Sequence, residues 1–151
     1  MKRGLLMWGC LLSVLLPTLQ AIAEEMVELR IETVLATDVV EKLDDRLTGM
    51  RKQLDAFRYS SYRLVQEERR RVSYGKEANF LLPGGRLLQV VPKQHTNDKI
   101  SLQVMLMEGA TPTPLMNTSL LIPNHGMFFV GGPKHAAGAL IIRIGAAVSE
   151  E

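Results

Sequence analysis

The stretch KISLQVMLME, residues 99–108, has the clearest alternation of apolar and polar side chains in this sequence. Every second position from Ile100 to Leu106 is aliphatic, and a period of two predicts a half-buried β-strand. The other face is only partly polar, because Met105 and Met107 share it with a serine and a glutamine. The stretch therefore predicts a strand whose outer face keeps some apolar surface.

Similar patterns lie on both sides of this strand and are separated by short turns. We predict further strands at 28–35, 76–82, 87–91, 115–122, 127–130 and 139–144, and the charged segment 59–72 also suits an extended chain. Turns are predicted at 83–85 and at 123–126, where Gly126 suits a positive φ. Short connections between successive strands favour antiparallel pairing.

One segment has the periodicity of a helix. Asp38 and Glu41 fit a capping box, and an apolar stripe follows at steps of three and four residues. The stripe consists of Leu43, Leu47, Met50, Leu54 and Phe57. Because one helix covers only one face of a sheet, we predict an α+β fold that forms a curled sheet or partial barrel. It would have one N-terminal strand and one amphipathic helix, followed by about six mostly antiparallel strands.

The first 23 residues have the parts of a secretory signal peptide. Lys2 and Arg3 precede an apolar run, and Ala21 and Ala23 are the small residues that a signal peptidase requires. Cleavage after Ala23 would leave one α+β domain at 24–148 and a short acidic tail at 149–151. Retention as an uncleaved N-terminal anchor is the alternative. We expect export to the periplasm or cell envelope, with no transmembrane helix after cleavage.

Composition narrows the function classes. The chain has 18 basic and 16 acidic residues, and removal of Lys2 and Arg3 would leave 16 of each. A formally neutral domain does not predict nucleic-acid binding. Cleavage would also remove Cys10, the only cysteine, so we expect no disulfide.

The sequence offers no motif for catalysis. It lacks a Gly-rich phosphate loop, HExxH, GxSxG and CxxC, so we predict a non-enzymatic domain without cofactor or metal. His95, His125 and His135 all fall in predicted loops, and the last two could approach one end of the sheet. Histidine is a common metal ligand, but this spacing matches no standard finger. Exposed loop histidines are the simpler interpretation.

The charge run at residues 67–71, EERRR, has two interpretations. It could protect an edge strand against aggregation. Alternatively, Arg69, Arg70 and Arg71 could form an anion-binding strip for lipid phosphate, polysaccharide or an acidic partner. Protection of an edge is the commoner use of such a run.

Excess apolar strand surface indicates a partner unless the sheet curls over it. The candidate partner surface consists of Met105, Met107, Phe128 and Ile141. We therefore expect a periplasmic or envelope-associated domain that binds another protein, or itself, within a larger assembly. The alternative function is a binding module for an anionic lipid or glycan of the envelope, and either function allows contact with a membrane surface.

Residues 131–138 are predicted to form a loop between the last two strands. Gly131 and Gly132 follow a strand directly, where glycine permits a bulge or a close backbone approach. We expect this loop to be ordered at its glycine end and exposed at Lys134 and His135. Replacement of Gly132 by valine should then block the backbone conformation.

The segment NTSLLIPNHGMFFVGGP, residues 117–133, resembles a hairpin in the core domain of bacterial secretins, which form oligomeric outer-membrane channels. Gly126 and the pair Gly131-Gly132 carry the resemblance. The sequence differs in Pro133 and lacks the rest of a secretin, so the resemblance implies an envelope context and not a channel subunit. The whole chain is also similar to the short exported proteins of Gram-negative bacteria.

Overall fold

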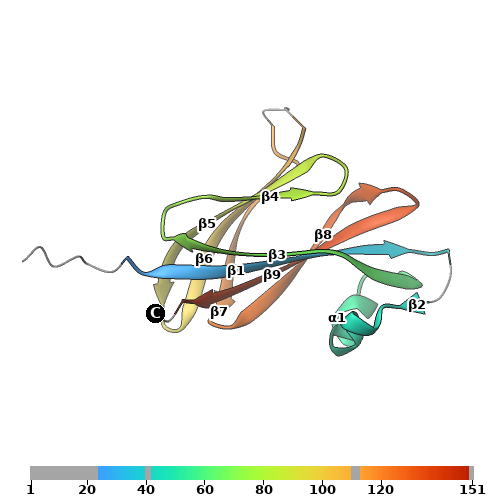
Figure 1. Ribbon diagram of the computed structural model, residues 1–151, viewed down its shortest axis with the longest axis horizontal. Helices are drawn as coiled ribbons and strands as arrows, with labels where there is room; N and C mark the ends of the chain where they lie inside the picture. Colours follow the sequence, from blue (N-terminus) through green and yellow to red (C-terminus); the bar gives the residue numbers. More distant parts are fainter. Residues whose placement is uncertain (1–23, 40–41, 110–112, 150–151) are drawn as a thin grey trace, which may run out of the picture.

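A computed structural model describes residues 24–39, 42–109 and 113–149. The described residues are mostly β-structure with one short helical segment (Figure 1). The strands are β1 (Met26–Thr37), β2 (Lys42–Leu43), β3 (Ser61–Ser73), β4 (Ala78–Leu82), β5 (Arg86–Thr96), β6 (Lys99–Glu108), β7 (Met116–Pro123), β8 (Gly126–His135) and β9 (Gly138–Val148). The helical segment is a 3₁₀ turn, Asp45–Met50, followed by α1 (Arg51–Asp55).

The strands form two sheets that together make a curled half-barrel. One sheet has the order β2-β3-β1-β9-β8, and the other has the order β4-β5-β6-β7. The described ladders are antiparallel except for the two-residue pairing of β2 with β3. In the five-stranded sheet β1 lies between β3 and β9, and β9 pairs in turn with β8, whereas β4 to β7 pair in the order of the sequence. The predicted curled, mostly antiparallel sheet is confirmed at this level, and the α+β layout fits in outline.

The main core lies between the two sheets. On β6 the aliphatic residues from Ile100 to Leu106 are all buried, as the alternation predicted. They meet the inward side chains of the other sheet, including Leu29 and Ile31 of β1 and Ile144 of β9. Each fully buried aliphatic side chain contributes roughly 1.5–3 kcal/mol. The core therefore fixes which face of every strand points inward.

The helical segment begins later than the sequence predicted. Asp44 caps its start by accepting a hydrogen bond from the Arg46 amide at 3.1 Å, whereas Asp38 accepts one from the Ser60 amide instead. Glu41 lies outside the described residues. The reason for the shift is that Lys42 and Leu43 are used in β2, next to β3. The segment is short, so the long amphipathic helix of the prediction is wrong.

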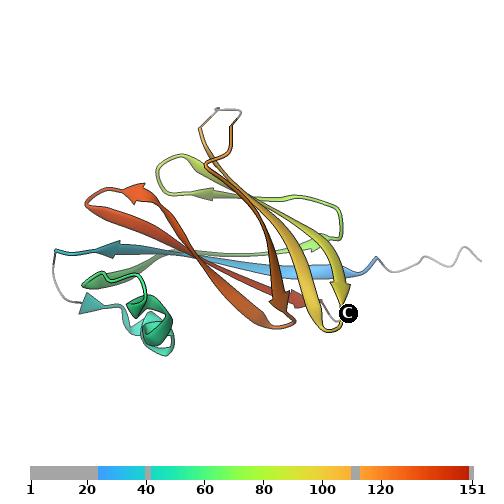
Figure 2. The ribbon, with the colours of Figure 1, turned by 180° about the vertical axis from the view of Figure 1, so that it is seen from behind.

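A second apolar cluster lies between this helical segment and the outer face of the five-stranded sheet. Leu47 and Leu54 are completely buried against Val34 of β1 and Ile141 of β9. The Tyr62 hydroxyl donates to the Leu54 carbonyl at 2.7 Å, which ties α1 to β3. Figure 2 shows the helical segment beside the C-terminal end of β1. The four-stranded sheet crosses the N-terminal half of β1.

The predicted loop at 131–138 is mostly strand. β8 continues to His135, and only Ala136 and Ala137 form the turn before β9. The glycine pair lies at an irregularity in the β8–β9 register, between Gly131 and Lys134. A Cβ added to Gly132 would lie 2.6 Å from the Leu140 carbonyl oxygen, so Gly132 permits a close backbone approach. Lys134 and His135 were both predicted to be exposed. Lys134 is exposed, but His135 is half-buried.

The turn between β7 and β8 also differs from the prediction. His125, not Gly126, has the positive φ, of 63°. Gly126 instead permits a close approach to the backbone of Pro123. A Cβ added to Gly126 would lie 2.7 Å from the Pro123 carbonyl oxygen. The turn carries the chain from one sheet to the other, and no ladder joins β7 and β8 among the described residues. Residues 117–133 therefore do not form one paired hairpin.

The two ends of the sequence lie outside the described residues. These ends include the predicted signal peptide at 1–23 and the last two residues of the acidic tail. Within the described part of the chain, no helix is long and apolar enough to cross a membrane.

Candidate binding surfaces

A charged patch covers half of the outer face of the five-stranded sheet. Alternation on β1 points Glu28, Arg30 and Glu32 to this face, away from the core. The ladder register places Arg69 of β3 opposite Arg30, and Arg143 of β9 opposite Glu32. The second half of the same face is apolar and lies under the helical segment. The charged side chains thus gather beside the helical segment and not beneath it.

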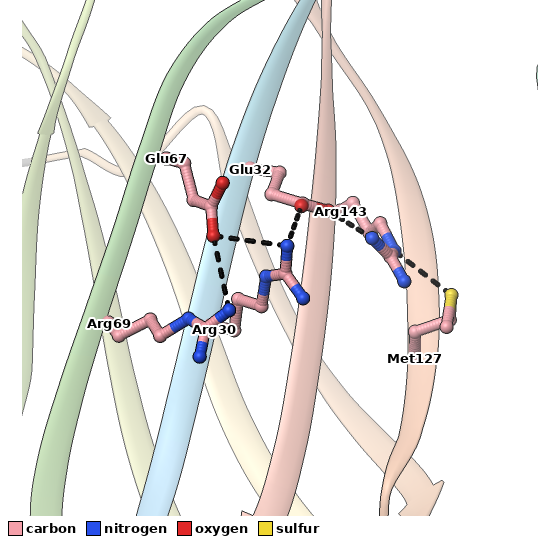
Figure 3. Close-up of polar contacts among 6 residues, drawn as sticks. All are labelled: Arg30, Glu32, Glu67, Arg69, Met127 and Arg143. Atoms are coloured by element: carbon pink, nitrogen blue, oxygen red, sulfur yellow. Dashed lines mark hydrogen bonds and ion pairs between the residues drawn. The ribbon is translucent and has the colours of Figure 1, made fainter. Parts of the chain in front are cut away.

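Glu32 is the centre of this patch and is buried. Its side chain is 2% exposed, forms an ion pair with the guanidinium group of Arg30 at 2.7 Å, and accepts a hydrogen bond from that of Arg143 (Figure 3). Arg30 also pairs with Glu67 at 3.0 Å, and Arg69 contacts the same carboxylate at 3.4 Å. The second contact of Arg143 is from Nε to the Met127 sulfur at 2.9 Å. We call these five charged residues the Glu32 cluster: Arg30, Glu32, Glu67, Arg69 and Arg143.

The Glu32 cluster carries an unbalanced positive charge. Three arginines face two glutamates, which leaves one net positive charge at the surface of the sheet. A buried carboxylate costs several kcal/mol in lost hydration unless it is paired. Glu32 has two partners, so its burial is compensated. The Nε of Arg30, in contrast, is buried without a hydrogen-bond partner among the described residues.

Two adjoining hollows open over the cluster, of about 240 Å³ and 280 Å³. Both are lined by Arg30, Glu32, Met127 and Arg143. One extends over small residues at the C-terminal end of β9, and the other extends toward the helical segment at Met50. The shared lining makes them one groove, which we call the outer groove. It combines charged groups with a floor of glycine and alanine.

The predicted anion-binding strip is divided between two faces. Arg69 and Arg71 point to the outer face and pair with Glu67 and Glu28, respectively. Arg70 points the other way, lies 5.1 Å from the centre of the Phe80 ring and pairs with Glu68 at 2.5 Å. Beyond Tyr62, β3 has β1 as its only ladder partner among the described strands. The charge run therefore lies on a sheet edge, and each of its arginines pairs with a glutamate of the run or with Glu28.

The candidate partner residues do not form one surface. Ile141 is 1% exposed and packs under the helical segment, so the expectation that it faces a partner is wrong. Around Ile141 the central strand β9 is covered on both faces, which sequence alternation could not reveal. Phe128 is exposed on β8, whereas Met105 and Met107 are half-buried on the outer face of the other sheet.

The three histidines are not brought together. His125 and His135 lie at opposite ends of the ten-residue strand β8, which corrects the expectation that both could approach one end of the sheet. His95 pairs with Glu25 at 3.5 Å near the N-terminal end of β1. The part of the chain that the structure describes holds no group of three metal-ligating side chains.

The Glu32 cluster was missed by the sequence analysis. In the strand predicted at 28–35, alternation places Glu28, Arg30 and Glu32 on the polar face, yet Glu32 is buried. One signal was available, because Arg143 interrupts an otherwise apolar run, ALIIRIG, at 139–145. A charged residue in such a run requires a partner of opposite charge.

Comparisons with known proteins identified no family model, no curated protein and no solved structure that matches this chain.

Proposed function

We propose that this chain is an exported, non-enzymatic domain of the periplasm or cell envelope that binds another protein as part of a larger assembly. One observation supports the protein-binding part above all. Four of the seven exposed large apolar side chains in the described residues lie on or directly before β7 and β8, namely Leu115, Leu121, Met127 and Phe128. A partner that covers them would remove this apolar surface from water.

The backbone at the same place is also available for pairing. β7 bonds to β6 alone and β8 bonds to β9 alone among the described strands, so each has a free edge. We call the place where these consecutive strands belong to different sheets the β7/β8 seam. Apolar side chains beside free strand edges are typical of surfaces that pair with another chain. A second copy of this protein or a different protein could supply the added strand.

The test compares two exposed apolar sites. The double variant Leu121→Gln/Phe128→Gln removes apolar surface at the β7/β8 seam, and Leu81→Gln is the matched control on β4, where the leucine is 66% exposed. We expect the wild-type protein to bind the dye ANS and to self-associate in light scattering after size-exclusion chromatography. The double variant should lose both properties, and the control should keep them. A wild-type protein that is strictly monomeric and does not bind ANS contradicts the proposal.

Export has its own test. Mass spectrometry of the protein from a periplasmic fraction should give a chain that begins at Glu24. A protein that remains in the cytoplasm with Met1 intact contradicts both the signal peptide and the envelope location.

A second candidate function is binding of an anionic lipid or glycan of the envelope. Arg69 and Arg71 support it, because both lie on the outer face with more than half of their side chains exposed. Binding to vesicles that contain phosphatidylglycerol should weaken steeply with salt. The variant Arg69→Glu/Arg71→Glu should abolish it, whereas Arg63→Glu, an exposed site elsewhere on β3, should not. Equal binding by all three proteins removes this candidate.

A further inference from the structure

We propose that the outer groove is a binding site for a small monocarboxylate, with Arg30 and Arg143 as the residues that hold the carboxylate. This site does not depend on the proposed protein-binding function. Guanidinium groups form paired, charge-assisted hydrogen bonds with carboxylates, and the geometry of two parallel N–H donors suits them. The proposal is based on the free donors of these two arginines, their charge balance and the shape of the groove.

The first argument is the state of the two guanidinium groups. The ion pairs of Arg30 with Glu32 and Glu67 are both made through Nη2. Arg143 uses Nη1 for Glu32 and Nε for the Met127 sulfur. Among the described residues no hydrogen bond or ion pair involves the other terminal nitrogen of either arginine, and in Figure 3 both of these nitrogens point away from Glu32. Two guanidinium groups therefore present donors together, while Glu32 fixes their positions.

The second argument is charge. On the outer face, Arg46 is paired with Asp44 at 2.7 Å, and Arg71 lies beside Glu28. The Glu32 cluster remains with one unbalanced positive charge, to which Arg69 contributes from beside the groove, while the charge of Glu28, which lines one end of the groove, is balanced by Arg71. One monoanion would neutralise the unbalanced charge of the cluster, whereas a dianionic phosphate would overcompensate. The side chain of Arg143 is only 14% exposed, so solvent compensates its charge weakly.

The third argument is the shape of the groove beside these donors. Its floor is Gly145, Ala146 and Ala147 of β9, and the Met127 side chain forms part of its wall. A hollow of about 240 Å³ is smaller than the usual sites for drug-sized ligands. It suits a carboxylate with a short aliphatic group. A free organic acid and the C-terminal end of a peptide share this chemistry.

The experiment follows the arginine side chains by NMR. The purified, ¹⁵N-labelled protein is titrated with butyrate and with N-acetyl-alanyl-alanine, and Nε–Hε signals report on each arginine. We expect saturable shifts at Arg30 and Arg143 with at least one of these acids and none at Arg63, an exposed arginine outside the groove. Shifts with butyrate alone identify a free acid as the ligand, and shifts with the peptide acid alone identify a peptide terminus. Butyramide, which has no charge, should give no shifts.

Two substitutions make the test specific. Arg143→Lys keeps a positive charge beside Glu32 but removes the forked donor, and it should weaken binding about tenfold, equivalent to about 1.4 kcal/mol. Glu32→Gln is isosteric and leaves both guanidinium groups less neutralised, so it should strengthen binding by roughly threefold or more. Arg63→Lys is the matched control and should leave binding unchanged.

Three results would overturn the proposal. The first is the absence of saturable shifts at Arg30 and Arg143 with either acid. The second is inorganic phosphate, at a pH at which it is mainly a dianion, competing as well as butyrate, since the charge argument favours a monoanion. The third is unchanged binding in both Arg143→Lys and Glu32→Gln. Met127 borders both the groove and the β7/β8 seam, but these experiments change only Glu32 and Arg143, and the seam is tested at Leu121 and Phe128, so the two proposals can fail separately.

Discussion

Replacement of Gly138 by alanine is expected to be among the most damaging single-methyl additions in this fold. Gly138 begins β9, and its ladder partner on β1 is Thr37. A Cβ added there would lie 1.8 Å from the Ala36 carbonyl oxygen and 2.9 Å from Cγ2 of Thr37. Both neighbours belong to β1, which pairs on two sides and cannot move alone. The glycine is therefore required by the close approach of two strands.

The size of the effect follows from this overlap. Ordinary contacts of a Cβ atom begin near 3.4 Å, so the alanine methyl and the carbonyl oxygen must separate by about 1.6 Å. Overpacking of this kind costs about 1–3 kcal/mol, and loss of a ladder hydrogen bond adds about 0.5–1.5 kcal/mol. We expect Gly138→Ala to lower the free energy of unfolding by roughly 2–4 kcal/mol. For a domain of this size, that corresponds to a decrease in Tm of about 8–15 °C.

The matched control is Gly145→Ala in the same strand. The nearest atoms to a Cβ at Gly145 are 3.7 Å away, which is ordinary contact, so its stability should change by about 0.5 kcal/mol or less. Urea and thermal unfolding of the wild type and both variants, followed by far-UV circular dichroism, give the comparison. Equal midpoints for Gly138→Ala and Gly145→Ala would refute the steric argument.

Three further predictions concern the β8 irregularity, the contact between α1 and β3, and the cap of the 3₁₀ turn. Gly132→Val should destabilise the fold by about 2 kcal/mol or more, because it places side-chain carbon against a carbonyl oxygen. Gly131→Val should cost less, because no backbone atom lies close to its Cβ position. Thermal unfolding of the two variants measures the difference. Tyr62→Phe removes a hydroxyl that donates once and accepts once, so it should cost about 1–2 kcal/mol in urea unfolding; an unchanged midpoint would contradict the role of this contact. The Arg46 guanidinium holds the pKa of the Asp44 carboxyl well below its ordinary value. The stabilisation from this pair is therefore complete above the unfolded pKa of about 3.9 and is lost as the pH falls toward the folded pKa. The Tm difference between wild type and Asp44→Asn should be constant from pH 7 to pH 5 and shrink below about pH 4. A difference that grows on acidification would contradict a lowered pKa for Asp44 in the folded protein.

Strand positions could be predicted from the sequence because alternation is a local property. The pattern at 99–108 coincides with β6, and most other predicted strands overlap the observed ones. Burial on both faces could not be predicted in the same way. Ile141 and Glu32 both lie on the outer face of central strands, where the helical segment covers Ile141 and arginine side chains surround Glu32, so their positions in an alternating pattern did not indicate whether they are exposed.

The boundaries of the helical segment depended on a contact that is distant in sequence. The capping pattern at Asp38 and Glu41 is a valid local signal. The helix does not start there, because Lys42 and Leu43 pair with the start of β3, nearly twenty residues later. The spacing of Leu47 and Leu54 still placed both on the buried side, because that spacing persists in a shorter helix.

The sequence by itself determined the strand-rich character of this protein, most of its turns and the inward face of β6, since each depends on neighbours within a few residues. Only the tertiary structure decided that β9 pairs with β1 across more than a hundred residues. That pairing brings Arg143 to Glu32 and creates the Glu32 cluster and the outer groove. The charged Arg143 in an apolar run indicates that a partner is needed, but a single sequence does not identify that partner, because the two groups meet only when the sheet closes.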